Sequence, residues 1–352
     1  MIDYIVVGLG LAGISFCEEL ENHKKTYLVF TDNSQTSSIV AGGLYNPVIL
    51  KRFTLAWNAK EQLSLAIPFY SKLEKKLNIK LDYKVSVLRR FASIEEQNLW
   101  FEACDKLQLS YFLSTNIIPN QNEAIEADFG YGEVLHTGRI ATKTLIEKYK
   151  EHLLKKEQLN VLTFNFNELK IEDEYISYQG LKARHIVFAT GFGLKENPYF
   201  SYLPLNGTKG ELLTIKAPNL KETRVIKSSV FIIPLGEDLY RIGATYKWKD
   251  KTNTPTQASK EELLEKLNSF LKCDYEVVQH VAGIRPTVTD RRPLVGTHPE
   301  HQTLHVLNGF GSRGVMIAPT ASKELYAAIE TNKPIDPEMN INRFTKKHFF
   351  KR

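Results

Sequence analysis

The first thirty-two residues, Met1 to Asp32, constrain the fold of this chain most strongly. An apolar run from Tyr4 to Val7 predicts a buried strand, and the sequence Gly-Leu-Gly-Leu-Ala-Gly follows directly at residues 8–13. Apolar residues at helical spacing come next, from Ile14 to Leu20, and the run from Thr26 to Phe30 predicts a second strand. A strand, a glycine turn, a helix and a second strand in this order are typical of the opening of a dinucleotide-binding fold.

Each glycine of this turn has a physical role in that interpretation. Gly8 permits the tight turn, Gly10 lets a pyrophosphate approach the backbone, and Gly13 lets the helix pack against the strand. We expect the N-terminus of the following helix to offer free N–H groups and its positive dipole end to the phosphates. The alternative is a glycine-rich turn that binds no ligand.

The acidic residue of this fold is displaced by one position. A carboxylate that binds the ribose hydroxyls normally ends the second strand, where this chain has Thr31. Asp32 is the next residue, and we expect it to take that role. The alternative is a carboxylate in a surface loop.

Composition excludes several classes of protein. The 352 residues suffice for two domains or one large interleaved unit, and 43% hydrophobic with 24% charged residues is ordinary for a soluble globular protein. No apolar run approaches the roughly 20 residues that span a bilayer. The three cysteines lie far apart with no metal-ligand spacing, which indicates a reduced, cytoplasmic protein without a metal site. The charge of +6 is scattered, so a solvated surface is favoured over an RNA-binding surface, although RNA stays possible.

Two further stretches have the composition of nucleotide-contacting segments. Residues 34–47 combine small hydroxyl side chains with Gly42, Gly43 and an Asn-Pro turn, which suits neither helix nor strand. Close approach of the backbone to a flat or charged group explains the glycines, and a long polar loop explains them equally well. The strand predicted from His185 to Ala189 ends in Ala-Thr-Gly, where small residues let a nucleotide cross the sheet edge, or simply form a turn.

The rest of the chain alternates between patterns for helices and strands. Apolar periodicity and capping boxes predict helices over residues 56–77, 93–107, 142–156, 259–271 and 315–329. Strands are predicted over residues 83–90, 161–166, 175–178, 211–215, 230–234, 240–248 and 304–307, and a loop over 116–127. The strands after Gly210 are separated by short turns, which indicates an antiparallel sheet unlike the opening unit. Arg285 follows an apolar strand, so we expect a partly buried guanidinium with an acidic partner.

In this order the segments resemble the flavin-dependent D-amino-acid oxidase superfamily. That superfamily includes glycine and sarcosine oxidases, D-amino-acid dehydrogenases and the oxidase domain of the bifunctional wobble-uridine tRNA modification enzyme. The resemblance covers essentially the whole chain. Its anchors are Gly8–Gly13, Ser37–Gly43, Ala189–Gly191, Gly243–Thr245, Gly283–Gly296 and the second glycine turn, Gly309–Gly314.

The resemblance implies an α/β fold in which a doubly wound, Rossmann-like FAD-binding domain carries an inserted antiparallel-sheet α+β substrate domain. The FAD domain would comprise residues 1–80, 140–205 and 285–352. The substrate domain would comprise residues 81–139 and 206–284.

The resemblance also implies where FAD lies. The pyrophosphate would meet Gly10–Gly13 and the ribose Asp32, and the turn Gly311–Met316 would face the flavin pyrimidine edge. The full set of implied cofactor-binding residues is Gly8, Gly10, Leu11, Ala12, Gly13, Asp32, Ser38, Gly42, Gly43, Ala189, Thr190, Gly191, Gly311, Ser312, Arg313, Gly314, Val315 and Met316.

Four residues match catalytic positions of the superfamily. Arg285 matches the arginine that holds the substrate carboxylate, with a buried ion pair as the alternative. Phe231 and Tyr246 match pocket positions facing the flavin, and Phe231 could equally be core. Glycine oxidases carry a second arginine where this chain has Ser312; here the arginine is Arg313, one position later, and this Gly-Ser-Arg-Gly turn is more similar to that of the tRNA-modifying oxidase domain. The alternative role for Arg313 is a salt bridge that braces the turn.

By this resemblance, the chain is an FAD-dependent oxidoreductase acting on a small-molecule amine. It would oxidise the C–N bond of an amino acid or N-substituted glycine by hydride transfer to flavin N5, giving an imine that hydrolyses. One alternative is oxidation of a carboxymethylaminomethyl group on the wobble uridine of tRNA. The other is a flavin-binding protein without turnover.

Overall fold

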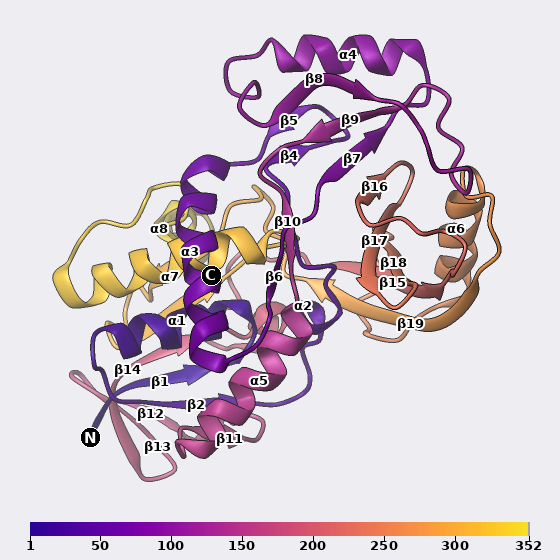
Figure 1. Ribbon diagram of the computed structural model, residues 1–352. Helices are drawn as coiled ribbons and strands as arrows, with labels where there is room; N and C mark the ends of the chain where they lie inside the picture. The colour runs from indigo at the N-terminus through magenta and orange to yellow at the C-terminus, as the bar shows by residue number, and fades with distance from the viewer. Residues whose placement is uncertain (351–352) are drawn as a thin grey trace.

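Two eight-stranded sheets organise the computed structural model, which describes residues 1–350 (Figure 1). The first sheet is built around β1 (Ile2–Val7), whose register pairs it in parallel with β2 (Tyr27–Thr31) and β14 (Leu181–Phe188). Two more strands continue it in parallel, β11 (Leu159–Val161) beside β2 and β21 (Leu304–Asn308) beside β14. The apolar runs of the sequence become these strands because both faces of the sheet are covered.

Antiparallel strands complete the first sheet. They are β12 (Leu169–Ile171), β13 (Ile176–Tyr178) and β20 (Leu294–Thr297). The long helices beside it are α1 (Leu11–Asn22), α3 (Ala59–Leu77), α5 (Thr142–Lys155) and α7 (Gly314–Thr331). Figure 1 shows α1, α3 and α7 grouped together over this sheet, and their buried faces belong to one hydrophobic core.

The second sheet has the order β19-β15-β18-β17-β16-β7-β9-β8. Its bounds are β7 (Val87–Arg90), β8 (Leu113–Ile118), β9 (Tyr131–Val134), β15 (Thr208–Lys216), β16 (Val225–Lys227), β17 (Phe231–Gly236), β18 (Leu239–Gly243) and β19 (Glu276–Arg285). Its pairs are antiparallel except β16 with β7. One face packs on α6 (Gln257–Asn268), and β9 supports α4 (Ile94–Cys104).

Short elements connect the two sheets. They are α2 (Ser37–Val40), β3 (Leu44–Tyr45), β4 (Val48–Ile49), β5 (Thr54–Leu55), β6 (Asp82–Tyr83) and β10 (Gly138–Ile140), with β3, β10 and β6 forming a small sheet. Single helical turns cover Phe166–Glu168, Gly191–Glu196, Asn342–Phe344 and Thr345–Phe349. Among the described residues, no helix has the length and apolar character to cross a membrane.

The expected fold class, a parallel nucleotide-binding sheet joined to an antiparallel one, is confirmed. Strands of the second sheet come from residues 87–134 and 208–285, close to the segments assigned to the substrate domain. The division into two domains with those bounds stays a prediction.

Several local predictions were wrong. The capping box at Ser259 does not start a helix, because Thr256 has extended backbone and its hydroxyl accepts the Ser259 N–H at 3.3 Å, so α6 begins at Gln257. Residues 34–47 are no plain loop but contain α2 and β3. Of the long strand expected over 240–248, only the part up to Gly243 forms, and the loop expected over 116–127 begins inside β8.

Candidate active site

A cavity of about 990 Å³ lies between the two sheets, and the N-terminal ends of α1 and α7 open onto it. Its lining includes every residue that the sequence analysis placed in the cofactor or catalytic site, except Gly13. These residues come from segments as far apart as Gly8 and Met316, so the fold brings them together. Their individual roles remain proposals, and the geometry below supports them.

The first glycine turn has the backbone that its sequence requires. Gly8 has φ +100°, and a Cβ there would lie 2.5 Å from the Ala189 carbonyl oxygen. A Cβ on Gly13 would lie 2.0 Å from the Gly8 carbonyl oxygen, so Gly13 is needed for packing and does not reach the cavity. Gly10 is the N-cap of α1 and supplies no side-chain cap, which leaves the Leu11 and Ala12 N–H groups facing the cavity.

Asp32 lies at one end of the cavity with its carboxylate already oriented. One oxygen accepts from the Ser34 N–H at 3.0 Å and hydroxyl at 2.6 Å, and the other accepts from the Thr163 hydroxyl at 3.0 Å. Burial raises the pKa of Asp32, but these hydrogen bonds outweigh it, so the pKa lies below its usual value. An ionised carboxylate with spare lone pairs can still accept from a ribose hydroxyl.

Gly42 and Gly43, between α2 and β3, are glycines for a different reason from the one that the sequence suggested, which was close approach to a flat or charged ligand. A Cβ on Gly42 would meet Ile233 Cδ1 at 2.7 Å, and one on Gly43, where φ is +72°, would meet the Ile140 carbonyl oxygen at 2.0 Å. The close approach is therefore to protein atoms of the second sheet and β10. Ser38, Gly42 and Gly43 line the cavity as a result of that packing.

The ends of β14 and β21 form the floor beside the first glycine turn. Ala189, Thr190 and Gly191 line the cavity, and the Thr190 hydroxyl is buried without a hydrogen-bond partner. The Asn308 amide donates to the Gly191 carbonyl at 2.9 Å and fixes this turn. A buried hydroxyl without a partner at a ligand cavity is expected where the ligand supplies the partner.

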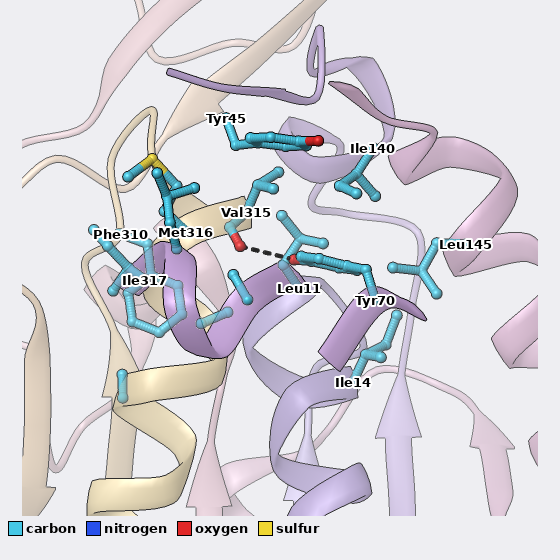
Figure 2. Close-up of a cluster of buried hydrophobic side chains, with 14 of the residues drawn as sticks. Leu11, Ile14, Tyr45, Tyr70, Ile140, Leu145, Phe310, Val315, Met316 and Ile317 are labelled. Atoms are coloured by element: carbon cyan, nitrogen blue, oxygen red, sulfur yellow. Dashed lines mark hydrogen bonds between the residues drawn. The ribbon is translucent and has the colours of Figure 1, made fainter. Parts of the chain in front are cut away.

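The second glycine turn leads into α7. Gly311, Ser312, Arg313, Gly314, Val315 and Met316 all line the cavity. Arg313 is the N-cap of α7, and its side chain caps none of the first N–H groups. Figure 2 shows Val315 and Met316 packed near Leu11 of α1, with the buried Tyr70 hydroxyl donating to the Val315 carbonyl at 3.0 Å.

These features fit FAD. Two uncapped helix N-termini, α1 and α7, meet one cavity, so the fold presents two positive dipole ends to an anionic, electron-accepting group. Gly10 leaves room for a pyrophosphate, since a Cβ there has only the Ser38 side chain within 4 Å. The residues that would hold the two ends of FAD are Asp32 and the Gly311–Met316 turn.

Arg285 is the last residue of β19, and its positive charge indicates what kind of ligand the site can bind. Its Nη1 donates to the Thr245 carbonyl at 3.3 Å, and its guanidinium lies 4.6 Å from the Tyr246 ring centroid. Burial lowers the pKa of Arg285, and Tyr246 opposes this shift. The acidic partner expected from the sequence is absent among residues 1–350, as no carboxylate there forms an ion pair with Arg285. A partly buried cation that lines a cavity without a counter-ion is suited to binding an anion.

Arg313 is a second cation at the end of the cavity where Arg285 and Tyr246 lie. Its Nη1 donates to the Asn46 carbonyl at 3.2 Å, burial lowers its pKa, and the described residues give it no ion pair. The alternative of a salt bridge bracing the turn is therefore wrong. Tyr246 is 46% exposed, and Phe231 lines the cavity while packing on the edge of the core.

Among the lining residues that the sequence analysis did not assign to the site are three lysines and one glycine. Lys227 and Lys51 line the cavity near Phe231, Lys150 lines its other end, and Gly210 lies beneath Arg285. A Cβ on Gly210 would lie 2.1 Å from Arg285 Nη2, so only glycine leaves the guanidinium its position. A glycine inside a predicted strand was the available signal for Gly210. The lysines look like any other surface lysine in the sequence.

Comparison with known proteins agrees with this geometry. The family model for FAD-dependent oxidoreductases, DAO, matches residues 3–328. Glycine oxidase of Bacillus subtilis (strain 168) is 28% identical over 163 residues, 44% of this chain and 43% of that protein. The tRNA 5-methylaminomethyl-2-thiouridine biosynthesis bifunctional protein MnmC of Azoarcus sp. (strain BH72) is 26% identical over 176 residues, 44% of this chain and 28% of that protein.

These two matches thus span less than half of either relative. The fold match is more extensive. The crystal structure of glycine oxidase from Geobacillus kaustophilus superposes with a TM-score of 0.78 at 18% sequence identity, covering 97% of both chains.

Proposed function

This chain belongs to the DAO family of FAD-dependent oxidoreductases, and we propose that it oxidises the C–N bond of an amino acid or N-substituted glycine. The observation that carries the proposal is Arg285, a partly buried guanidinium without a carboxylate partner in residues 1–350, which lines the cofactor cavity. A substrate carboxylate supplies the missing counter-charge. The glycine oxidases among the relatives act on a substrate with such a carboxylate.

We assign each residue of the site a role from its position. Arg285 would hold the carboxylate through its forked N–H groups, and the Tyr246 ring against its face limits where that carboxylate can lie. Arg313, on the cofactor side, adds positive potential without contacting an acid of the protein. Phe231 provides an apolar wall.

FAD, when bound, supplies the acceptor for the hydride that leaves the substrate carbon. Loss of that hydride and of the amine proton converts the substrate to an imine, which water hydrolyses. The positive ends of α1 and α7 favour negative charge in the cavity, so they would stabilise the reduced cofactor. No acid–base side chain of the protein is needed in this scheme.

Anaerobic mixing of the purified yellow protein with a panel of amino acids and N-alkyl glycines tests the proposal. We expect loss of the oxidised-flavin absorbance with at least one carboxylate-bearing amine, and none with the same amine lacking the carboxylate. A protein that retains FAD but is reduced by no member of the panel would be the flavin-binding protein without turnover, and the proposal would fail.

A second candidate is oxidation of a carboxymethylaminomethyl group on tRNA. It is favoured by the similarity to MnmC proteins and by the nearly half-exposed rings of Tyr246 and Trp248, which lie 6.0 Å apart and could stack on a base. A gel shift with tRNA that weakens steeply with salt would support it. Absence of any shift at low salt would exclude it.

A further inference from the structure

The face of the second sheet that lines the cavity carries one cation on β19, the edge strand, and another on β16, an interior strand. In the register of this sheet, Lys227, Phe231, Gly243 and Leu212 follow one another across β16, β17, β18 and β15. All four line the cavity, so this row of side chains points into it. Arg285 lies on β19 at the far side of the same face.

Three glycines line part of the space between these two cations, beside Phe231 and Leu212. Gly210 and Gly283 pair with each other across β15 and β19, and Gly243 on β18 pairs with Leu212, two residues further along β15; all three glycines line the cavity. Four strand spacings, about 19 Å, separate the backbones of β19 and β16. The long side chains of Arg285 and Lys227 shorten the gap between the charges, but it remains longer than glycine itself.

Lys227 is not neutralised by the protein. Its Nζ donates to the Ser228 carbonyl at 2.6 Å and the Ser229 carbonyl at 3.4 Å and lies 4.9 Å from the Phe231 ring centroid. No carboxylate of residues 1–350 forms an ion pair with it. Burial, together with the nearby cations Arg89, Lys266 and Lys51, lowers the pKa of Lys227 to about 8.

The other cations near Lys227 differ in their partners. Arg89 is paired with Glu96 at 2.7 Å and Lys266 with Glu262 at 2.6 Å. Lys51 lines the cavity, and the described residues offer it no ion pair. Lys227 and Lys51 are therefore the cations near β16 without a paired carboxylate, as Arg285 is on β19.

We infer that the substrate carries a second anionic group, a carboxylate or a phosphate, which Lys227 on β16 binds while Arg285 on β19 holds the carboxylate beside the amine. The inference rests on the proposed function and narrows its substrate class to elongated N-substituted glycines or amino acids. Lys51 adds to the attraction for the distal group. Lys227 then determines specificity and takes no part in the oxidation.

Three N-substituted glycines of equal length test this: N-butylglycine and its counterparts with a carboxylate or a phosphonate in place of the terminal methyl. The measurement is the concentration that gives half-maximal anaerobic flavin reduction. We expect it to be about tenfold lower for an anionic tail than for the butyl tail, since a charged hydrogen bond contributes a factor of this order. The better of the two anions identifies the distal group.

Lys227→Met should abolish this preference and leave the value for N-butylglycine within about twofold. Lys266→Met is the matched control, because Lys266 lies near Lys227 but is paired with Glu262 and does not line the cavity. It should retain the preference. Equal values for all three tails in the unaltered protein, or equal losses in both variants, would overturn the inference.

Two further results separate this inference from its premise. Failure of every amine, small or elongated, to reduce the flavin would refute the proposed function. In that case, thioether analogues with sulfur in place of the amine nitrogen still report binding through the flavin absorbance, and the same tail preference is expected. If Lys227→Met weakened FAD retention as strongly as ligand binding, Lys227 would be a cofactor residue and the inference would be wrong.

Discussion

Arg285 owes its position to a residue that has no side chain. Its guanidinium lies flat against the backbone of Gly210 on the neighbouring strand, and the three atoms that a Cβ on Gly210 would approach most closely all belong to that guanidinium. Glycine inside a strand weakens the sheet, so its presence in the middle of β15 requires a reason. Room for Arg285 is that reason.

Gly210→Ala should displace the guanidinium and raise the KM for carboxylate-bearing amines about tenfold, with FAD retention unchanged. A double-mutant cycle with Arg285→Met identifies the route of the effect. If Gly210 acts through Arg285, Gly210→Ala costs little more when Arg285 is already Met. Additive losses would show that Gly210 acts independently of Arg285.

At this scale the sequence identified residue types better than contacts. Arg285, Tyr246 and Arg313 were found because they match motif positions, and the structure places all three at the cavity. The ion pairs expected for Arg285 and considered for Arg313 are absent from the described residues. The sequence could not show this, because which carboxylates come near an arginine depends on tertiary structure. Lys227 was missed since only the strand register reveals which way a lysine of β16 points.

At the scale of elements, α7 depends on a hydrogen bond from α3. Within α7, the carbonyl of Val315 would normally accept from the residue four positions on, but that residue is Pro319, which has no N–H. The buried hydroxyl of Tyr70 supplies the missing donor at 3.0 Å, as Figure 2 shows. The first turn of α7, which faces the cofactor cavity, is thereby fixed from outside the helix.

Tyr70→Phe should therefore destabilise the protein by about 1–2 kcal/mol, because it leaves a buried carbonyl without a donor. It should also weaken FAD retention, since the affected turn lines the cavity. Thermal unfolding and the fraction of FAD retained on gel filtration measure the two effects.

Pro319→Ala provides a rescue for this variant. An alanine N–H can bond to Val315 within the helix, so the double variant Tyr70→Phe/Pro319→Ala should recover most of the lost stability. If the double variant were no more stable than Tyr70→Phe alone, the proposed exchange of donors would be wrong.

Long elements were predictable and their ends were not. The helix predicted over residues 56–77 forms as α3 (Ala59–Leu77), and its apolar residues Leu63, Ala66, Tyr70 and Leu73 are buried. The predicted start of α6 was two residues too late, because Thr256 rather than a later residue caps the helix. Thr256 is held there by the buried Glu211 carboxylate, which accepts from its N–H at 2.7 Å and from its hydroxyl at 2.9 Å. Such a contact between distant segments leaves no mark in the local sequence.

For the whole molecule, buried histidines make stability depend on pH. Burial lowers the pKa of His298 to about 4, and His301 adds to the shift. Burial and the neighbouring His185 hold the pKa of His305 well below its usual value. The unfolded chain then binds protons more readily than the fold, so this stability is fully present above about pH 6.5 and is lost as the pH falls towards 4.

His298→Phe should remove part of this dependence while keeping an aromatic ring against Phe200 and Phe349. We expect the loss in unfolding free energy between about pH 8 and about pH 5 to shrink by roughly 1 kcal/mol. Chemical denaturation at the two pH values measures it. An unchanged loss would show that His298 is equally easy to protonate in the folded and unfolded protein.

The sequence predicted the order of secondary-structure elements along the whole chain better than it predicted element ends or residue contacts. The opening strand–turn–helix–strand unit, the antiparallel middle and the return to a glycine turn and helix are all present, because each rests on a long periodic pattern. The cavity between the sheets could not be seen in any single segment. It arises where Gly10, Gly43 and Gly311, from three separate segments, face one space.

The most direct measurement is anaerobic flavin reduction by one N-substituted glycine, compared with the same amine lacking the carboxylate, in the unaltered protein and in Arg285→Met. The account predicts that only the carboxylate-bearing amine reduces the unaltered protein efficiently, and that Arg285→Met loses on the order of a hundredfold in kcat/KM while retaining FAD. Equal reduction by both amines, or loss of FAD together with activity in Arg285→Met, would contradict it.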